Sequence, residues 1–228
     1  MKKNARLKVT VSLALVLFLV ILIPLLVQNK GSIESFGKRS NVITSEETKT
    51  VASKGLTFDE VTNDLVKDTQ MTKDEAISIL SASAKDSSTG LALPAKQTAE
   101  TAQYRTIEKS ISVTPDYQPR IKFYCSTKES GSSFQIVKIF YVEIIKNSNG
   151  LTKQFNGSVF INVENENTIF CMIDGDFYDN GVMSGMGRVN LGVGEHTTLH
   201  YDISQQTKHY AYCYRENRCV FDAASKRV

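Results

Sequence analysis

Residues 158–164 read Ser-Val-Phe-Ile-Asn-Val-Glu, and this stretch carries the clearest strand signal in the chain. Val159, Ile161 and Val163 fall on one side of an extended chain, whereas the polar residues at 158, 162 and 164 fall on the other. Side chains that alternate with period two are typical of a β-strand. The stretch therefore predicts a strand that buries one face and exposes the other to water.

The same signal extends outward over residues 103–228. Residues 107–113 and 121–125 also alternate, while residues 134–145 are apolar on both faces at their middle, which indicates a central strand. Turn-forming residues separate the runs, namely Asn149-Gly150, Asn156-Gly157, Asn165-Glu166-Asn167 and Asp179-Asn180-Gly181. Because strands follow one another without helices, the sequence predicts an antiparallel β-sandwich or open barrel of about seven to nine strands.

Two short helices are expected ahead of this β domain. Thr57 with Glu60, and Thr72 with Glu75, have the spacing of the capping box, in which each side chain satisfies a backbone amide of the other residue. These two starts predict a helical hairpin at residues 57–86, followed by a linker at 87–102. The fold class expected for the chain is thus mainly β, or α+β.

The N-terminus predicts a transmembrane helix. Val9 to Val27 is nineteen residues without a charged side chain, long enough to cross a bilayer. The basic residues ahead of it are Lys2, Lys3, Arg6 and Lys8. This bias predicts a single-pass signal-anchor at residues 1–30, which binds the membrane through residues 9–27 with the N-terminus inside the cell and the C-terminal domain outside. A signal peptide cleaved near Gly31 or Ser32 is the alternative, and it would give a secreted protein.

Residues 31–56 are rich in Ser, Thr, Lys and Glu without periodicity, and they predict a flexible stalk. The net charge of +3 for the whole chain includes five basic residues and no acid within residues 1–30, so the remainder carries about −2. A mildly acidic body has no electrostatic footprint for nucleic acid. No nucleic-acid partner is therefore expected.

Four cysteines lie in the C-terminal half of the chain, and an even number outside a membrane favours disulfides. Cys213 and Cys219 flank five residues, so a hairpin would place them opposite each other and predicts a Cys213–Cys219 bond. Cys125 and Cys171 are in phase with apolar neighbours and are expected in the core. They either bridge two sheets as Cys125–Cys171 or remain buried free thiols.

A tyrosine stripe is the first candidate site. Tyr210, Tyr212 and Tyr214 alternate, which predicts three rings on one face of a strand. Exposed tyrosines bind sugars, peptides or proteins, because each ring offers an apolar face and a hydroxyl group. The alternative is that the same rings cover the surface of the sheet and bind nothing.

Asp174, Asp176 and Asp179 are the second candidate site. Carboxylates on a glycine-bearing turn could gather oxygen ligands for calcium. The spacing departs from the EF-hand order by one residue, and a solvated turn explains the same residues. No other cofactor is expected, and no catalytic residues are identified, since the three histidines lack metal-ligand spacing and Ser184 lies outside a G-x-S-x-G frame.

The opening Met1-Lys2-Lys3, the long Leu/Val core, the lysine- and asparagine-rich body and the Ser/Thr/Glu stalk resemble exported proteins of Gram-positive bacilli. Some such proteins are carried by prophages. This resemblance implies a place at the cell surface and transfers no activity. The expected function is a membrane-tethered extracellular module that binds a protein or another envelope component. The alternatives are a secreted antimicrobial or immunity-type protein and an envelope hydrolase.

Overall fold

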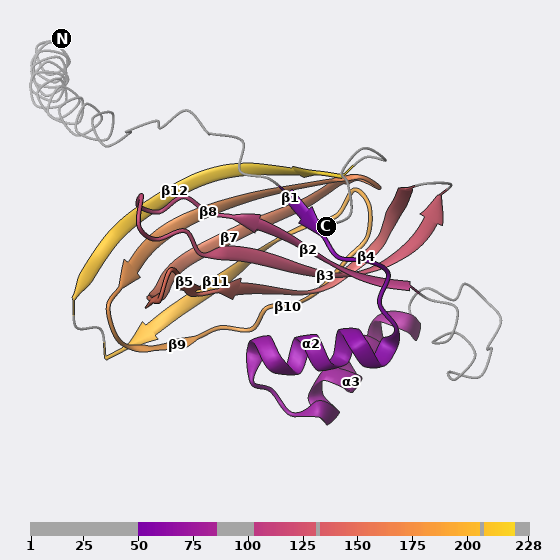
Figure 1. Ribbon diagram of the computed structural model, residues 1–228, viewed down its shortest axis with the longest axis horizontal. Helices are drawn as coiled ribbons and strands as arrows, with labels where there is room; N and C mark the ends of the chain where they lie inside the picture. Colours follow the sequence, from indigo (N-terminus) through magenta and orange to yellow (C-terminus); the bar gives the residue numbers. More distant parts are fainter. Residues whose placement is uncertain (1–49, 86–102, 131–132, 206–207, 222–228) are drawn as a thin grey trace, which may run out of the picture. The chain divides into compact units, whose positions relative to one another are not determined.

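The computed structural model describes residues 50–85, 103–130, 133–205 and 208–221 of the 228-residue chain. Two helices and twelve strands lie within this part (Figure 1). In chain order they are β1 (Thr50–Ala52), α2 (Phe58–Thr69), α3 (Lys73–Lys85), β2 (Gln103–Ser110), β3 (Arg120–Ser130), β4 (Ser133–Ile145), β5 (Asn147–Ser148), β6 (Leu151–Thr152), β7 (Gln154–Asn165), β8 (Thr168–Tyr178), β9 (Val182–Ser184), β10 (Arg188–Leu191), β11 (His196–Ser204) and β12 (His209–Val220).

The fold is mainly β with antiparallel sheets, as the alternation predicted. The first sheet has the strand order β1-β2-β3-β4-β10, and the second has the order β12-β8-β7-β11-β9. Every pair of neighbouring strands in these sheets is antiparallel. The long strands β7, β8 and β12 curve together along one side of the β domain (Figure 1).

One hydrophobic core joins the two sheets. Ile107, Phe123 and Val142 of the first sheet belong to the same buried cluster as Ile161 and Ile173 of the second. The alternating residues of each strand supply this core, so residues 158–164 bury the odd-numbered side chains as expected. Each sheet therefore has one inner face in the core and one outer face.

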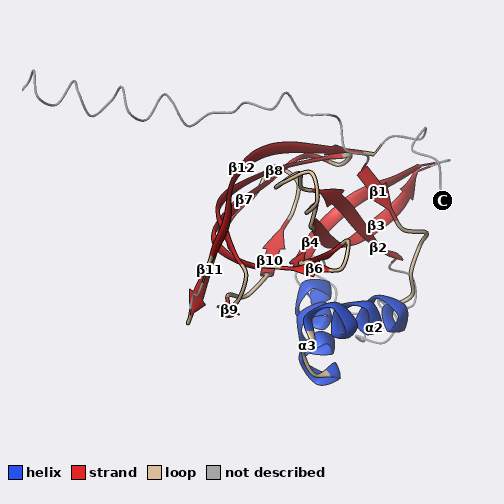
Figure 2. Ribbon diagram, turned by 60° about the vertical axis from the view of Figure 1, so that its left-hand side comes forward, coloured by secondary structure: helices blue, strands red, loops and turns tan. Residues whose placement is uncertain are grey.

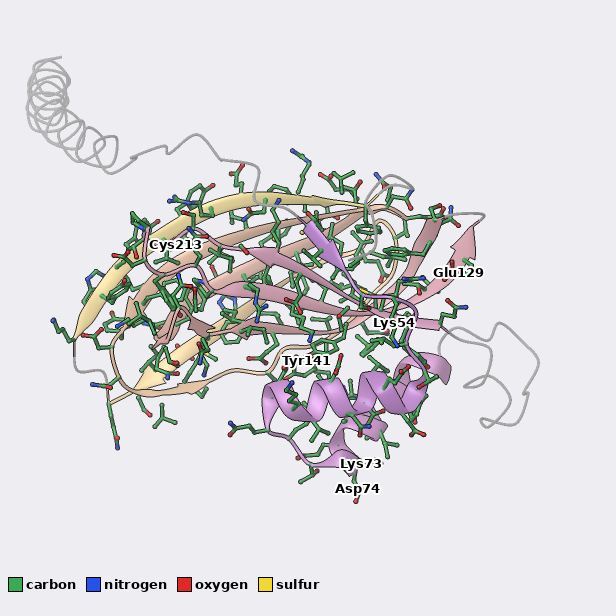
Figure 3. The ribbon with its side chains drawn as sticks, viewed as in Figure 1. Lys54, Lys73, Asp74, Glu129, Tyr141 and Cys213 are labelled. Atoms are coloured by element: carbon green, nitrogen blue, oxygen red, sulfur yellow. The ribbon has the colours of Figure 1, made fainter. Side chains whose placement is uncertain are left out.

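The helices α2 and α3 cover the outer face of the first sheet (Figure 2). A second buried cluster fills this contact, and Tyr141, labelled in Figure 3, lies at the helix side of the sheet. Its members are Val61, Leu65, Ala76, Ile79, Leu80, Tyr104, Tyr124, Phe140 and Tyr141. This cover explains why residues 134–145 are apolar on both faces, because β4 packs on the core with one face and on the helices with the other.

Both predicted capping boxes are confirmed. The backbone amide of Glu60 donates to the Thr57 hydroxyl at 3.2 Å, and the Thr57 amide donates to the Glu60 carboxylate at 2.8 Å. Thr72 and Glu75 repeat this exchange at 3.3 and 2.9 Å. Each box fixes the first turn of its helix, because it satisfies amides that have no partner within the helix.

The stalk predicted at residues 31–56 is wrong at its C-terminal end. Thr50–Ala52 forms β1, which pairs with Ile107–Lys109 of β2, and Leu56 forms an isolated bridge with Tyr104. The pairing follows from tertiary context, since Thr50 and Val51 are good strand formers next to an unpaired edge of β2. Residues 31–49 of the predicted stalk and the predicted linker at 87–102 lie outside the described residues.

Three of the four turn signals lie where they were expected. Asn149 and Gly150 have φ of 53° and 75° and join β5 to β6, as an Asn-Gly hairpin requires. Asn156-Gly157 is instead inside β7, where Gly157 faces Gly175 of β8 on the inner side. A Cβ atom on Gly157 would lie 2.3 Å from the Asp174 carbonyl oxygen. The glycine therefore permits close strand approach rather than a turn.

A glycine-bearing segment passes from the second sheet to the first between β9 and β10. A Cβ atom on Gly185 would lie 2.6 Å from the Tyr201 ring, and one on Gly187 would lie 1.8 Å from the Val142 carbonyl oxygen. The Val142 amide donates to the Gly187 carbonyl at 2.8 Å. The glycines thus let this segment lie flat against both sheets.

No helix within the described residues is long and apolar enough to span a membrane. The predicted transmembrane segment at residues 9–27 lies outside that part of the chain.

Candidate functional site

The outer face of the second sheet is the candidate binding surface. Outward-facing residues of β12, β8, β7 and β11 stand in cross-strand rows, of which Tyr214, Asp174, Ser158 and His200 form one. The main contacts of α2 and α3 with the sheets are with β2 and β4 of the first sheet. Many polar side chains on the outer face of the second sheet therefore remain accessible to solvent.

Tyr212 and Tyr214 form the most exposed aromatic part of this face. Their exposed fractions are 49% and 43%. The Tyr212 hydroxyl donates to the Asp174 carboxylate at 2.8 Å, and the Tyr214 hydroxyl donates to Glu216 at 2.6 Å. These hydrogen bonds to carboxylates fix the orientation of both rings, and the ring faces remain exposed to solvent.

The pKa values of both tyrosines are raised. Desolvation, followed by the hydrogen bond and charge of Asp174, raises the pKa of Tyr212 to about 12. The hydrogen bond to Glu216 is the largest cause that raises the pKa of Tyr214. An aromatic ring beside a carboxylate attracts cations through the ring face and the charge together.

Tyr210 does not belong to this surface, so the predicted three-residue stripe is wrong at its first member. The β8–β12 register shifts between His209 and Ala211, which turns the Tyr210 ring toward the core. Tyr210 and Thr114 share a hydrogen bond of 2.9 Å between their hydroxyl groups, and the Tyr210 ring packs edge-on against Tyr117. A β-bulge adds one residue and reverses side-chain parity, which simple alternation does not anticipate.

The three aspartates predicted for calcium do not lie on one turn. Asp174 and Asp176 point outward from β8, and Asp179 follows the strand. Each has its own partner: Asp174 accepts from Tyr212, Asp176 lies 2.9 Å from His209 Nε2, and Asp179 lies 2.7 Å from Lys153 Nζ. The hydrogen bond from Lys153 lowers the pKa of Asp179. No group of metal-ligating side chains suited to an ion occurs among the described residues.

A half-buried apolar group lies beside the tyrosines on the same outer face. Phe160 of β7 and Phe170 of β8 have ring centroids 6.2 Å apart, and Met172 is opposite Phe160. Arg218 stands over Phe170 at 5.1 Å and makes a two-pronged salt bridge with Glu164. Sequence reasoning missed this group, although large apolar residues at the polar positions of β7 and β8 were a visible signal.

Serine, histidine and aspartate are neighbours on this face, but in an order that does not activate a nucleophile. Ser158 pairs with Asp174 on one side and with His200 on the other. A catalytic triad needs the histidine between the other two residues. Here His200 and Asp174 are two strands apart, which is roughly 9–10 Å.

A second polar cluster joins α2 to the first sheet. The Asp68 carboxylate accepts hydrogen bonds from Lys122 and from the Tyr124 hydroxyl, both at 2.6 Å. Glu143 on β4 lies opposite Lys122 and feels the Asp68 charge. Burial raises the pKa of Glu143 to about 7. This cluster lies between helix and sheet, so we assign it to packing rather than to ligand binding.

All four cysteines are free and buried, and both predicted disulfides are therefore absent from this structure. Cys213 and Cys219 lie on one continuous strand, β12, where a six-residue separation spans roughly 20 Å. The Arg-Glu-Asn-Arg run between them was expected to form the turn of a hairpin, but it pairs with Phe170–Ile173 of β8. Two cysteines at that distance are beyond the reach of a disulfide.

Cys125 and Cys171 do face the core as predicted, from opposite sheets. The thiol that contacts Cys171 is that of Cys219 on the neighbouring strand, and their hydrogen bond, together with burial, raises the pKa of Cys171. Burial also raises the pKa of Cys125 and raises that of Cys213 to about 11. The thiols of Cys125, Cys171 and Cys213 are thus protonated at neutral pH, whereas the hydrogen bond with Cys171 lowers the pKa of Cys219.

The fold and the outer face together define an antiparallel β module with a two-helix cover on one side. Comparisons of the chain with protein-family models, with curated proteins and with solved structures find no match. The functional assignment therefore rests on the chain's own residues.

Proposed function

We propose that the protein is a membrane-tethered extracellular module whose β-sandwich binds a protein or another envelope component. The hydrophobic residues 9–27 and the basic residues ahead of them support the tether and its orientation. The open outer face of the second sheet supports a binding role. The observation that carries it is the pair of exposed rings, Tyr212 and Tyr214, held by Asp174 and Glu216.

The chemistry of this face favours a partner with positive charge. Asp174, Asp176 and Glu216 lie beside the two rings, and a cationic side chain can contact a ring face and a carboxylate at once. Lysine- or arginine-bearing segments of an envelope protein have this property. Binding through exposed charges weakens as salt screens them.

Protease treatment of intact cells tests the tether. The full chain, carrying a C-terminal epitope, should stay in the membrane fraction and lose that epitope to external protease. A C-terminal fragment that begins near residue 31 and is found in the medium would instead favour the secreted alternative. Protection of the epitope in intact cells would reject an extracellular domain.

Photocrosslinking tests the binding face in the same cells. A photoreactive amino acid at position 212 of the full chain should form adducts that decrease when the salt concentration rises. The matched control is the same amino acid at Val137, which is exposed at 38% on β4 of the first sheet. Equal adduct patterns from both positions would contradict a specific face.

A further inference from the structure

The edge of the second sheet formed by β12 differs from the other sheet edges. The sheets end at β1, β10, β9 and β12. The first three contain only three, four and three residues, whereas β12 contains twelve. Short edge strands protect a sheet from pairing with another chain, and a long one is a template for such pairing.

The sequence of β12 also lacks two of the residue types that commonly protect an edge strand. Residues 209–220 contain neither proline nor lysine. The irregular register lies at the start, between His209 and Ala211, and leaves the rest of the strand paired continuously with β8. Among the described strands, β8 is its one partner in the sheet. The outward side chains of β12 include three exposed apolar residues, namely Tyr212, Tyr214 and Val220.

From these features we propose that β12 pairs with β12 of a second copy of this chain. The pairing is antiparallel, with a twofold axis at Asn217, and it joins two second sheets into one continuous sheet. Such an interface is closed, because the same strand contributes to both sides. Backbone hydrogen bonds supply affinity and side-chain pairs supply register.

Pairing of opposite charges favours this register over the neighbouring registers. With the axis at Asn217, Glu216 lies opposite the second copy's Arg218, and the reverse pair forms on the other side of the axis. The same arrangement places Tyr214 opposite the second copy's Val220. Moving the axis by one residue to Glu216 opposes two glutamates, and moving it to Arg218 opposes two arginines. Like charges directly opposite each other destabilise a strand pair, so neighbouring registers are disfavoured.

Charge exchange tests the proposal with the full chain in detergent micelles. Sedimentation should show a dimer for the wild type and at least tenfold weaker association for Glu216→Arg and for Arg218→Glu, because each change creates two like-charge pairs. The double variant E216R/R218E restores opposite charges and should restore the dimer. Asp202→Arg, on an exposed position of β11, is the matched control and should stay dimeric.

Several outcomes would overturn the proposal. A monomeric wild type is one, and a double variant no better associated than the single variants is another. Dimers that persist in all variants would assign association to another part of the chain. A photoreactive amino acid at position 214 should link to a peptide containing Val220 of the second copy. If position 214 forms adducts only with a different protein, self-pairing is rejected. The edge of β12 would then bind a strand of that other protein.

Discussion

Glu143→Gln should make the protein less sensitive to pH between 5 and 8. Burial raises the pKa of Glu143 from 4.5 to about 7, against the opposing charge of Lys146 and with the charge of Asp68 in support. The folded state therefore holds a proton that the unfolded state releases. The stability linked to this proton is complete below pH 4.5 and is lost as the pH rises through about 7.

The gap between the two pKa values sets the size of the effect. At about 1.4 kcal/mol per pKa unit, the upper limit is about 3 kcal/mol, and partial solvent access of the carboxyl group reduces it to about 1–2 kcal/mol. The glutamine variant cannot ionise and keeps the same shape, so it should be more stable than the wild type at pH 8. At pH 5 the two proteins should differ little.

Urea unfolding of the full chain at pH 5 and pH 8 measures this difference. The free energy of unfolding of the wild type should fall by about 1–2 kcal/mol more than that of Glu143→Gln over this interval. Asp202→Asn, at an exposed position of β11, is the matched control for the removal of one carboxyl group. Parallel profiles for the wild type and Glu143→Gln would refute the assignment of a buried, protonated carboxyl group.

Three further substitutions test the packing. Asp68→Ala should lower the free energy of unfolding by about 2–4 kcal/mol in urea titration, because Lys122 and Tyr124 lose a shared buried acceptor; a loss below about 0.5 kcal/mol would contradict this. Gly187→Ala should lower the melting temperature, since its Cβ atom would meet a backbone oxygen at 1.8 Å, and an unchanged melting temperature would show that the segment yields. Thr57→Ala should cost about 1 kcal/mol in the same titration through loss of the cap of α2, and Thr57→Ser should restore most of it.

Local patterns in the sequence predicted the elements well. The alternation at residues 158–164 and the two capping boxes depend on neighbouring residues alone, so they can be read without knowledge of the fold. The Asn149-Gly150 turn is of the same kind, because it needs two residues with positive φ. These features fixed the class of fold and the start of each helix.

Features that depend on strand pairing could not be predicted in this way. Tyr210 turns inward because one extra residue sits in β12, and no local signal marks that bulge. The contact of Cys171 with Cys219 depends on which strand lies next to β8. A hairpin was expected at Tyr214–Arg218 because Cys213 and Cys219 flank this run, yet the run continues as strand and pairs with β8.

The two outer faces explain why binding is assigned to the second sheet. The first sheet carries an aromatic outer surface, with Tyr104, Tyr124 and Phe140, and the helices bury it. Binding there would require α2 and α3 to leave, which exposes that entire cluster to water at a large cost in free energy. On the second sheet, Tyr212 and Tyr214 are already exposed and their hydroxyl groups are already satisfied by acids. A partner can therefore contact these rings without first disrupting the fold, and this difference supports the proposal that recognition takes place on the second sheet.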